Sequence, residues 1–413
     1  MFGEGWHFAI GALLVASVVL RSGLLFVVSL ALLLVAATSR LWDKYCLSRV
    51  EYRRYFSQQR AFFGEEIELT VEITNRKLLP LAWLEVEDEI PTELEPRQGR
   101  VTPCHKAGRS LLLNLLSLRW YERVRRRYRV RCDVRGYHSF GPVALRSGDL
   151  FGFYRRGLTL DGEDHLLVYP RVVPLVQLGL PAKDPFGDRK ARQWLFEDPL
   201  RVAGTREYVY GDSLRRVDWK ATARTQQLQV RVYEPTTTYR LVIFLNLNTF
   251  GGYWWWLGYD SDLLELSISV AASVANWAVE QGYHVGLFAN GNARRSDQKV
   301  KVAPSRDPDQ LTHILEALAK VLPFATMPLE GLLRLESHDL PYGATLVVVT
   351  AVLGEDILKE LLALKAAGHR IALLLVGDEA PSFRWDGIAV HRVGGEAAWR
   401  DLREIAGEPL SLT

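Results

Sequence analysis

Cysteine is scarce in this chain of 413 residues, which has only Cys46, Cys104 and Cys132. The three lie far apart, their number is odd, and none belongs to a C-x-x-C pair. A disulfide framework needs paired cysteines, and a structural zinc site needs closely spaced thiolates or imidazoles. The sequence therefore predicts neither, and it favours a reducing compartment.

The signatures of familiar enzymes are absent as well. The chain contains no Walker A loop, no G-x-G-x-x-G, no H-E-x-x-H and no G-x-S-x-G, and its nine histidines are scattered without ligand spacing. We therefore predict no catalytic residue, no bound metal and no cofactor. An enzyme of an unfamiliar kind stays open as an alternative.

A large excess of charge is also missing, because the formal net charge is only +3. A chain that binds a polyanion needs a much larger excess or a local basic patch. Nucleic acid is therefore not an expected partner.

Hydrophobic residues, by contrast, make up 48% of the chain, enough for a membrane anchor and two domains. Two apolar runs open the sequence, residues 6–20 and 23–38, with Arg21 near their junction. A single continuous span would bury Arg21 at a cost of about 2.5–3.5 kcal/mol, whereas a hairpin places it in the turn. A cleaved signal peptide fits poorly because no Lys or Arg precedes the apolar region. We predict a transmembrane helical hairpin over residues 1–45, although each run is short beside the ~20 residues of a normal span.

The flanking charges predict the orientation of this hairpin. Only Glu4 is charged before the first run. The basic residues after the second run are Arg40, Lys44, Arg49, Arg53 and Arg54. Because cytoplasmic flanks carry the excess of Lys and Arg, we expect a multi-pass protein of the cell membrane with the bulk of its chain in the cytoplasm.

Short stretches of alternating apolar and polar residues follow, as in residues 66–75. A period of two indicates half-buried strands, and turn signals such as Gly141-Pro142 separate them. This pattern predicts an antiparallel β-sandwich of immunoglobulin-like type over residues 46–173.

One of these strands carries a row of arginines on one face, at Arg125, Arg127, Arg129 and Arg131. We favour the solvated outer face of an exposed strand. The alternative is a surface for anionic lipid headgroups, at about 1 kcal/mol per charge near a membrane. Nucleic acid fits less well, since the nearby aromatic residues fall on the opposite face.

Residues 205–224 combine Gly-Asp, paired arginines and Asp-Trp-Lys in one short stretch. This stretch resembles the signature of the bacterial family catalogued as domain of unknown function 58 (DUF58), which runs roughly R-x-Y-x-x-G-D-x-x-R-x-I-D-W-K-x-S-A-R. The matching positions are Arg206, Tyr208, Gly211, Asp212, Arg215, Asp218, Trp219, Lys220, Ala223 and Arg224. A second family element, D-P-F-G-L, is matched by residues 149–153, with Leu150 in place of proline.

Two interpretations of the signature are open. Its carboxylates and arginines would suit chemistry on an anionic substrate, with a carboxylate as base and an arginine to hold the anion. We favour an internal ion-pair network packed around Trp219, because no nucleophile is paired with a histidine. In that interpretation residues 174–235 form an extended, docked connector, which either clamps two domains together or presents a face to a partner.

From residue 236 to 413, apolar strands alternate with helices. The expected strands cover residues 239–245, 284–289, 345–350 and 370–376, and the expected helices cover residues 262–280, 308–321 and 356–367. This alternation predicts an α/β domain with a doubly wound parallel sheet. In order and size the domain resembles a von Willebrand factor A-like domain, which the family resemblance also implies.

That resemblance implies a metal site after the first strand, built on D-x-S-x-S. The matching positions here are Asn246, Asn248 and Phe250, and Thr350 ends a later strand with no aspartate after it. An amide lacks the charge that Mg²⁺ seeks, and phenylalanine offers no ligand. We therefore predict that this metal site is degenerate.

An aromatic run follows at Tyr253, Trp254, Trp255 and Trp256. Three adjacent tryptophans cannot all face one core, so at least one is expected to contact a protein partner or a membrane interface. The equal alternative is a loop that folds over the degenerate metal site.

Members of the resembling family are commonly encoded beside MoxR-type AAA+ ATPases. The resemblance thus implies a role in assembling or remodelling membrane or envelope complexes with that ATPase. The prediction is a membrane-anchored cytoplasmic adaptor, held in the lipid bilayer by its N-terminal helices and bound to a protein partner. The alternative is an enzyme that uses the Asp and Arg cluster of the signature on an anionic substrate.

Overall fold

The structure of the protein is a computed structural model in which the chain divides into two compact units. One unit comprises Met1–Arg171 with Leu318–Lys320, and the other comprises Val172–Ala317 with Val321–Thr413. The structure describes residues 5–175, 197–209, 217–235, 240–250, 258–294, 298–341, 343–377, 388–394, 399, 402, 405 and 407–409.

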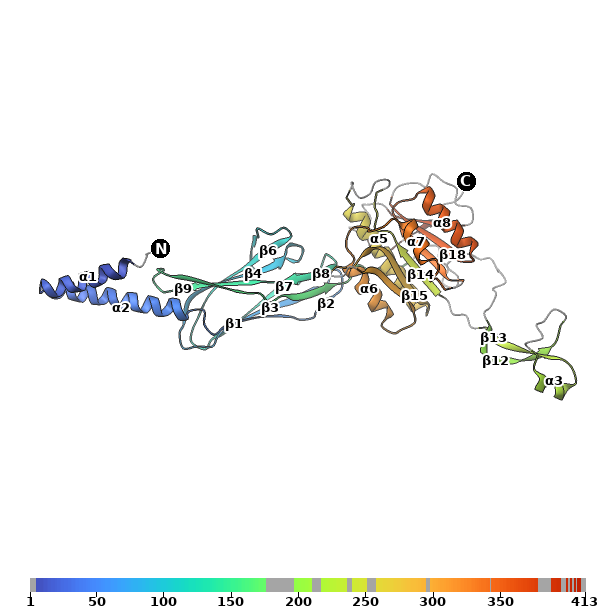
Figure 1. The fold of residues 1–413 in the computed structure, drawn as a ribbon, viewed down its shortest axis with the longest axis horizontal. Helices are drawn as coiled ribbons and strands as arrows, with labels where there is room; N and C mark the ends of the chain where they lie inside the picture. Colours follow the sequence, from blue (N-terminus) through green and yellow to red (C-terminus); the bar gives the residue numbers. More distant parts are fainter. Residues whose placement is uncertain are drawn as a thin grey trace. The chain divides into compact units, whose positions relative to one another are not determined.

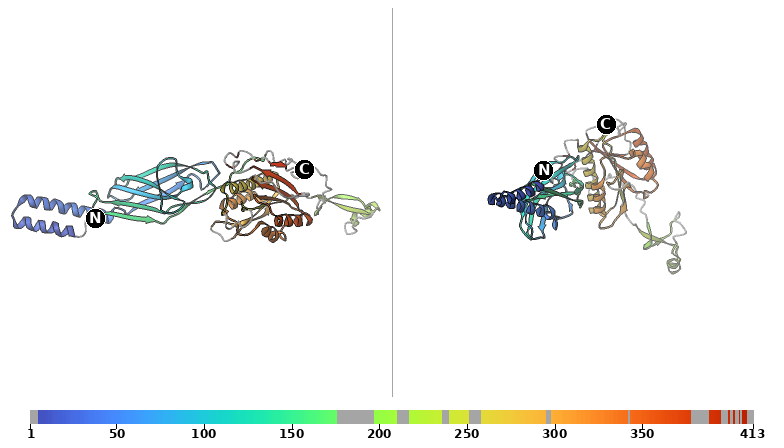
Figure 2. Two further views of the ribbon diagram at one scale, coloured as in Figure 1. Left: turned by 90° about the horizontal axis from the view of Figure 1, so that it is seen from above. Right: turned by 60° about the vertical axis from the view of Figure 1, so that its left-hand side comes forward.

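Two helices open the first unit, α1 (Gly5–Val19) and α2 (Gly23–Tyr45), and they lie side by side in Figures 1 and 2. Arg21 lies in the turn between them, with a φ of 50°. Helix α2 has 23 residues, so it continues well past the apolar run that ends at residue 38. By length and composition α2 is long and apolar enough to cross a membrane.

The rest of the first unit is built from strands that alternate inward and outward. Three antiparallel strands form the sheet β1-β3-β7, five form the sheet β10-β9-β4-β6-β5, and a smaller sheet has the order β2-β11-β8. The elements are β1 (Val50–Phe56), β2 (Arg60–Ala61), β3 (Glu66–Asn75), β4 (Leu81–Pro91), the 3₁₀ turn η1 (Thr92–Leu94), β5 (Arg100–Pro103), β6 (Arg109–Leu118), β7 (Arg123–Arg131), β8 (Gly136–Phe140), β9 (Val143–Gly148), β10 (Arg155–Leu160) and β11 (Asp164–Val168).

One hydrophobic core joins these sheets. Ile67 and Leu69 on β3 and Leu84 and Val86 on β4 are buried in the same cluster, so the sheets pack through their apolar faces. The alternation read from the sequence therefore orients these strands correctly. We call this part, residues 46–171, the β domain.

The arginine row on β7 lies on the exposed face, as expected for a solvated strand. The register sets Arg125 opposite Glu72 and Arg129 opposite Glu68 on β3. Arg125 Nε is 2.5 Å from Glu72 Oε2. Glutamates on β3 therefore offset the charge of the arginine row on β7. Lipid binding by β7 would need an uncompensated cationic surface, which this face is not.

We predicted an extended connector over residues 174–235, but its described residues 197–209 and 217–235 form regular structure. Strands β12 (Glu197–Glu207) and β13 (Gln229–Pro235) pair antiparallel, and the short helix α3 (Trp219–Thr225) precedes β13. The prediction was wrong because α3 has only seven residues, too few to reveal a helical period, and the β12 ladder is interrupted by register shifts.

A seven-stranded sheet forms the rest of the second unit, in the order β16-β15-β14-β17-β18-β19-β20. The inner strands are parallel, but β16 and β20 pair antiparallel at the two edges, so the sheet is mixed and not fully parallel as predicted. The elements are β14 (Arg240–Leu245), α5 (Ser261–Glu280), β15 (His284–Asn292), β16 (Lys299–Ser305), α6 (Gln310–Lys320), α7 (Leu329–Glu336), β17 (Thr345–Thr350), α8 (Glu355–Ala366), β18 (Arg370–Val376), β19 (Ala389–Val393) and β20 (Gly407–Pro409).

Helices cover both faces of this sheet. Val242 and Phe244 on β14 share a core cluster with Leu332 on α7 and Leu361 on α8. The alternate residues of β14 point to the other face, where α5 contacts the central strands. This double cover explains why β14 is buried along nearly its whole length and reads as a continuous apolar run.

Candidate functional site

Asp218 organises the part of the signature that the structure describes. As the N-cap of α3, its Oδ1 accepts hydrogen bonds of 3.0 Å from the amides of Lys220 and Ala221. Its Oδ2 lies 3.0 Å from Arg231 Nε on β13. The bond from the Ala221 amide, followed by that from Arg231, holds the pKa of Asp218 below its usual range. One carboxylate therefore both starts the helix and ties it to the hairpin.

Trp219 follows Asp218 and is 69% exposed. The interpretation that makes Trp219 the packing anchor of an internal ion-pair network is therefore wrong. Lys220 and Arg224 on the same helix are exposed too, as is Arg206 on β12, while Tyr208 is half-buried. The conformation of α3 thus presents an aromatic ring together with basic side chains.

Several predicted positions cannot be placed in this arrangement. Gly211, Asp212 and Arg215 of the signature lie outside the residues that the structure describes. The same holds for the aromatic run at Tyr253, Trp254, Trp255 and Trp256.

Asn246 and Thr350, two of the positions that we predicted to form a degenerate metal site, come together at the carboxyl ends of β14 and β17. Asn246 Nδ2 donates to Thr350 Oγ1 over 2.9 Å, and both side chains are buried. Asn248 is half-buried, and its backbone amide donates to Asn246 Oδ1 over 3.1 Å. Phe250 is 37% exposed. The strand ends of the sheet thus bring together Asn246 and Thr350, which are far apart in sequence.

Asn290 completes this network, and the sequence analysis did not single it out. Its Nδ2 donates to Asn246 Oδ1 over 2.8 Å and to Met327 O over 3.0 Å, and its Oδ1 accepts from the Leu247 amide over 2.8 Å. A sequence signal for Asn290 was available. It is a polar residue near the end of the buried apolar strand β15, which follows β14 in the chain, and Asn246 comes directly after β14.

This donor set does not suit a hard divalent cation. Asn246, Asn290 and Thr350 are neutral, and their oxygens already accept hydrogen bonds from one another and from the backbone. Within the described ranges, no three His, Cys, Asp or Glu side chains form a group that could hold a metal ion. The geometry is that of a closed amide network which fixes the loop after β14.

A buried polar cluster in the β domain was also missed. Tyr52 Oη donates to Asp88 Oδ2 over 2.6 Å, and Arg54 Nε lies 3.5 Å from the same oxygen. The cluster joins β1 to β4, and therefore the three-stranded sheet β1-β3-β7 to the five-stranded sheet. Burial raises the pKa of Asp88 to about 6, although Arg54 and the Tyr52 hydroxyl act in the opposite direction. The sequence signal for this cluster was a charged residue, Arg54 on β1 and Asp88 on β4, on the face of the strand whose other residues are apolar or aromatic.

The family described as "Protein of unknown function DUF58" matches residues 204–382. The "Uncharacterized protein YeaD" of Bacillus subtilis (strain 168) is 25% identical over 343 residues, which cover 81% of this chain and 78% of YeaD. Both matches support the DUF58 family. The DUF58 match begins in β12, so it contains the signature hairpin and continues past the end of β18.

The similar solved structures are more distant. A non-cellulosomal cohesin from Archaeoglobus fulgidus has a TM-score of 0.21 at 10% identity and covers 29% of this chain and 91% of its own. The CARDB domain of a Pyrococcus furiosus protein, crystallised with di-metal ions, has a TM-score of 0.19 at 11% identity and covers 29% of this chain and 84% of its own. Scores this low bear on neither the fold nor the function of this chain.

Proposed function

We propose that this chain is a membrane-anchored interaction protein and that its signature segment docks a protein partner. The observation that carries the proposal is the 69% exposure of Trp219 on a helix that Asp218 fixes in place. Exposed tryptophans are costly in solvent and are frequent hot spots of interfaces. Lys220 and Arg224 are exposed cations on the same helix and favour an acidic rim on the partner.

The finer architecture belongs to the same proposal. Helices α1 and α2 would form the membrane hairpin, with the rest of the chain in the cytoplasm, as the basic residues after α2 favour. The β domain would be an immunoglobulin-like sandwich, supported by its antiparallel sheets around one core. The C-terminal α/β domain would be von Willebrand factor A-like without a metal, supported by its parallel inner strands, its helices on both faces and the neutral Asn246 network.

The partner that we propose is a MoxR-type AAA+ ATPase, and the process is the assembly or remodelling of membrane or envelope complexes. This choice rests on the DUF58 resemblance. A docking segment tethered at the bilayer would raise the effective concentration of the ATPase beside membrane complexes.

An enzyme acting through the signature is the weaker candidate. Both oxygens of Asp218 are engaged, one by the cap of α3 and the other by Arg231. A carboxylate with a lowered pKa and filled hydrogen-bonding positions is a poor general base.

Crosslinking and co-purification from native membranes test the adaptor function. We expect the wild-type chain to recover an AAA+ ATPase and Trp219→Ala to lose it. Truncating a hot-spot tryptophan costs about 2 kcal/mol or more, which is about thirty-fold in affinity. Asp218→Ala should act in the same direction, because loss of an N-cap costs about 1 kcal/mol of helix stability.

Trp120→Ala is the matched control, since Trp120 is 64% exposed and lies between β6 and β7, outside the signature sequence. It should recover the ATPase like wild type. If Trp219→Ala recovers as much ATPase as wild type, the signature is not the docking face. If wild type recovers no ATPase, the proposed adaptor function is wrong.

A further inference from the structure

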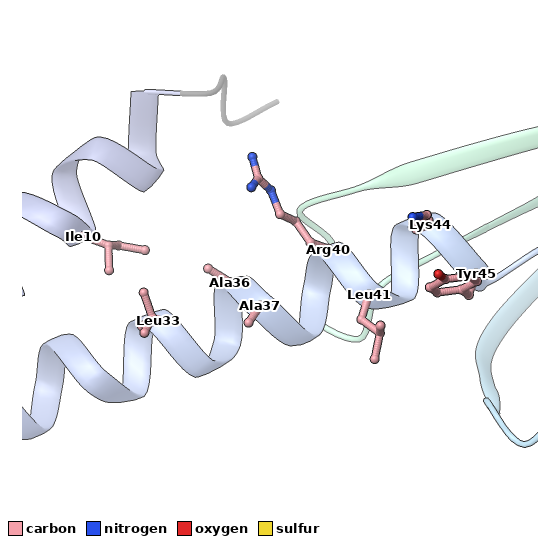
Figure 3. Close-up of a pocket in the computed structure, with 8 residues that line it drawn as sticks. All are labelled: Ile10, Leu33, Ala36, Ala37, Arg40, Leu41, Lys44 and Tyr45. Carbon is pink, nitrogen blue, oxygen red and sulfur yellow. The ribbon is translucent and has the colours of Figure 1, made fainter.

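The pair of N-terminal helices encloses a groove of about 560 Å³. Its floor is apolar, made by Ile10 from α1 and by Leu33, Ala36 and Leu41 from α2. Figure 3 shows Ile10 and Leu33 pointing toward one another across the space between the helices. The small side chain of Ala36 leaves room beside α2 in this part of the groove.

Two cations stand at the end of this floor. Arg40 and Lys44 are one helical turn apart on α2 and both are exposed. Arg40 forms no hydrogen bond or ion pair with the residues that the structure describes, and the Lys44 ammonium only lies 5.4 Å from the centre of the Tyr45 ring. An apolar groove that ends at two uncompensated cations is complementary to an amphiphile with an anionic head and an apolar tail.

The length of α2 places these groups at matching depths in a bilayer. Seventeen residue steps from Gly23 to Arg40, at about 1.5 Å each, give about 26 Å, close to the ~30 Å hydrocarbon core. Eleven steps from Leu33 to Lys44 give about 16 Å, the depth of roughly one leaflet. The groove therefore runs from headgroup level to about the middle of the membrane.

Contacts of the β domain independently support a membrane interface near Arg40. Ser39 Oγ, one residue before Arg40, donates to the buried Asp149 Oδ2 over 3.0 Å. Asp149 also accepts from the amides of Phe151 and Tyr154, which shapes the loop between β9 and β10. In that loop Leu150 is 59% exposed and Phe151 is 52% exposed. Exposed apolar side chains at the height of Ser39 suit a membrane interface and fit poorly in open water.

We propose that the groove binds an anionic phospholipid from the leaflet next to the β domain. The phosphate lies between Arg40 and Lys44, which together offer more donors than one phosphate can accept, and one acyl chain follows the floor past Ala36 to Leu33. This proposal rests on the membrane anchorage in the proposed function, and it adds a defined lipid site to that anchor.

The test uses the full-length chain in nanodiscs of phosphatidylcholine with a minor share of phosphatidylglycerol, with retained lipids counted by native mass spectrometry after release into detergent. We expect wild type to keep phosphatidylglycerol in preference to phosphatidylcholine. At about fivefold per charge near an anionic surface, Arg40→Gln with Lys44→Gln should weaken this retention about thirty-fold. Ala37→Trp keeps both charges but fills the groove, so it should lose the lipid as well.

Arg100→Gln with Arg129→Gln is the matched control, because it removes two exposed cations of the β domain that do not line the groove. It should retain phosphatidylglycerol like wild type. Equal retention by wild type and the Arg40 and Lys44 double variant would overturn the site, as would full retention by Ala37→Trp or equal retention of phosphatidylcholine.

Alkaline extraction of native membranes separates the two levels of the argument. If wild type is released, the membrane anchorage itself is wrong, and the lipid site falls with it. If every variant stays in the membrane but the lipid counts do not differ, the anchorage stands and only the lipid site is wrong.

Discussion

At the scale of single residues, Asp88 is a buried acid whose chemistry departs from that of a free side chain. It occupies an inward position of β4 with 0% exposure, within reach of Tyr52 and Arg54 on β1. Its Oδ1 has no hydrogen-bond partner among the described protein atoms. A buried carboxylate of this kind fixes one sheet against the other, and its ionisation carries a desolvation cost.

This cost predicts a pH dependence of stability. Burial raises the pKa of Asp88 from 3.8 to about 6 in the folded state. The folded chain then binds the proton more tightly than the unfolded chain, so the contribution of Asp88 is fully present below about pH 4 and is lost as the pH rises through about 6. The loss is at most about 3 kcal/mol for two pKa units.

Asp88→Asn removes the titration and keeps an acceptor for Tyr52. We expect the melting temperature of the variant, relative to wild type, to rise between about pH 4 and about pH 7. Thermal unfolding of the full-length protein in detergent measures it, with the exposed Asp133→Asn as the control whose difference should stay flat. A flat difference for Asp88→Asn as well would show that the carboxyl titrates normally.

At the scale of the elements, the loop after β14 depends on the amide network. Asn246 is held by Thr350 and Asn290, each of which comes from a different strand end. Asn246→Asp would place a carboxylate at the position where the family resemblance implies a metal ligand. It would also remove the donor to Thr350 and bury a charge without a counter-ion.

We therefore expect Asn246→Asp to lower the free energy of unfolding by about 2 kcal/mol or more. Added Mg²⁺ should not restore it, since one carboxylate among neutral amides and Phe250 is too weak a ligand set. Thermal unfolding with and without Mg²⁺ is the measurement, and Asn248→Asp, at a half-buried position, is the milder control. Rescue by Mg²⁺ would mean that a competent cation site needs only this single substitution.

The sequence predicted some elements well and missed others, for physical reasons. Strands β17 and β18 match the expected ranges because both are buried on both faces and read as uninterrupted apolar runs. Edge strand β16 and the short β20 carry no such run, since one side of an edge strand faces solvent. Helix α3 is too short to show a helical repeat of apolar residues, so the only sequence signal for it is its N-cap residue Asp218. Asn290 and the Tyr52 cluster depend on contacts across strands, which local patterns do not contain.

At the scale of the whole molecule, helix α2 is continuous with the β domain. The Trp42 indole donates to Pro80 O over 3.1 Å, and the Ser39 hydroxyl donates to Asp149. Lys77 Nζ donates to Cys46 O over 2.6 Å and to the Ser48 carbonyl over 2.8 Å. Burial lowers the pKa of Lys77 to about 8, as expected for an ammonium group used to cap the end of α2. The last turns of α2 are therefore structural parts of the β domain.

A pair of truncations tests this continuity. A chain that starts at residue 39 keeps Ser39 and Trp42 but loses the apolar part of α2, whereas a chain that starts at residue 46 loses both contacts. We expect both fragments to leave the membrane fraction without detergent and the longer one to be more stable by about 1–3 kcal/mol, from two hydrogen bonds and the packing around them. Cell fractionation and urea unfolding measure these two properties. Equal stability would show that α2 is an independent anchor on a flexible joint, and retention of both fragments in the membrane would place the bilayer contact in the β domain itself.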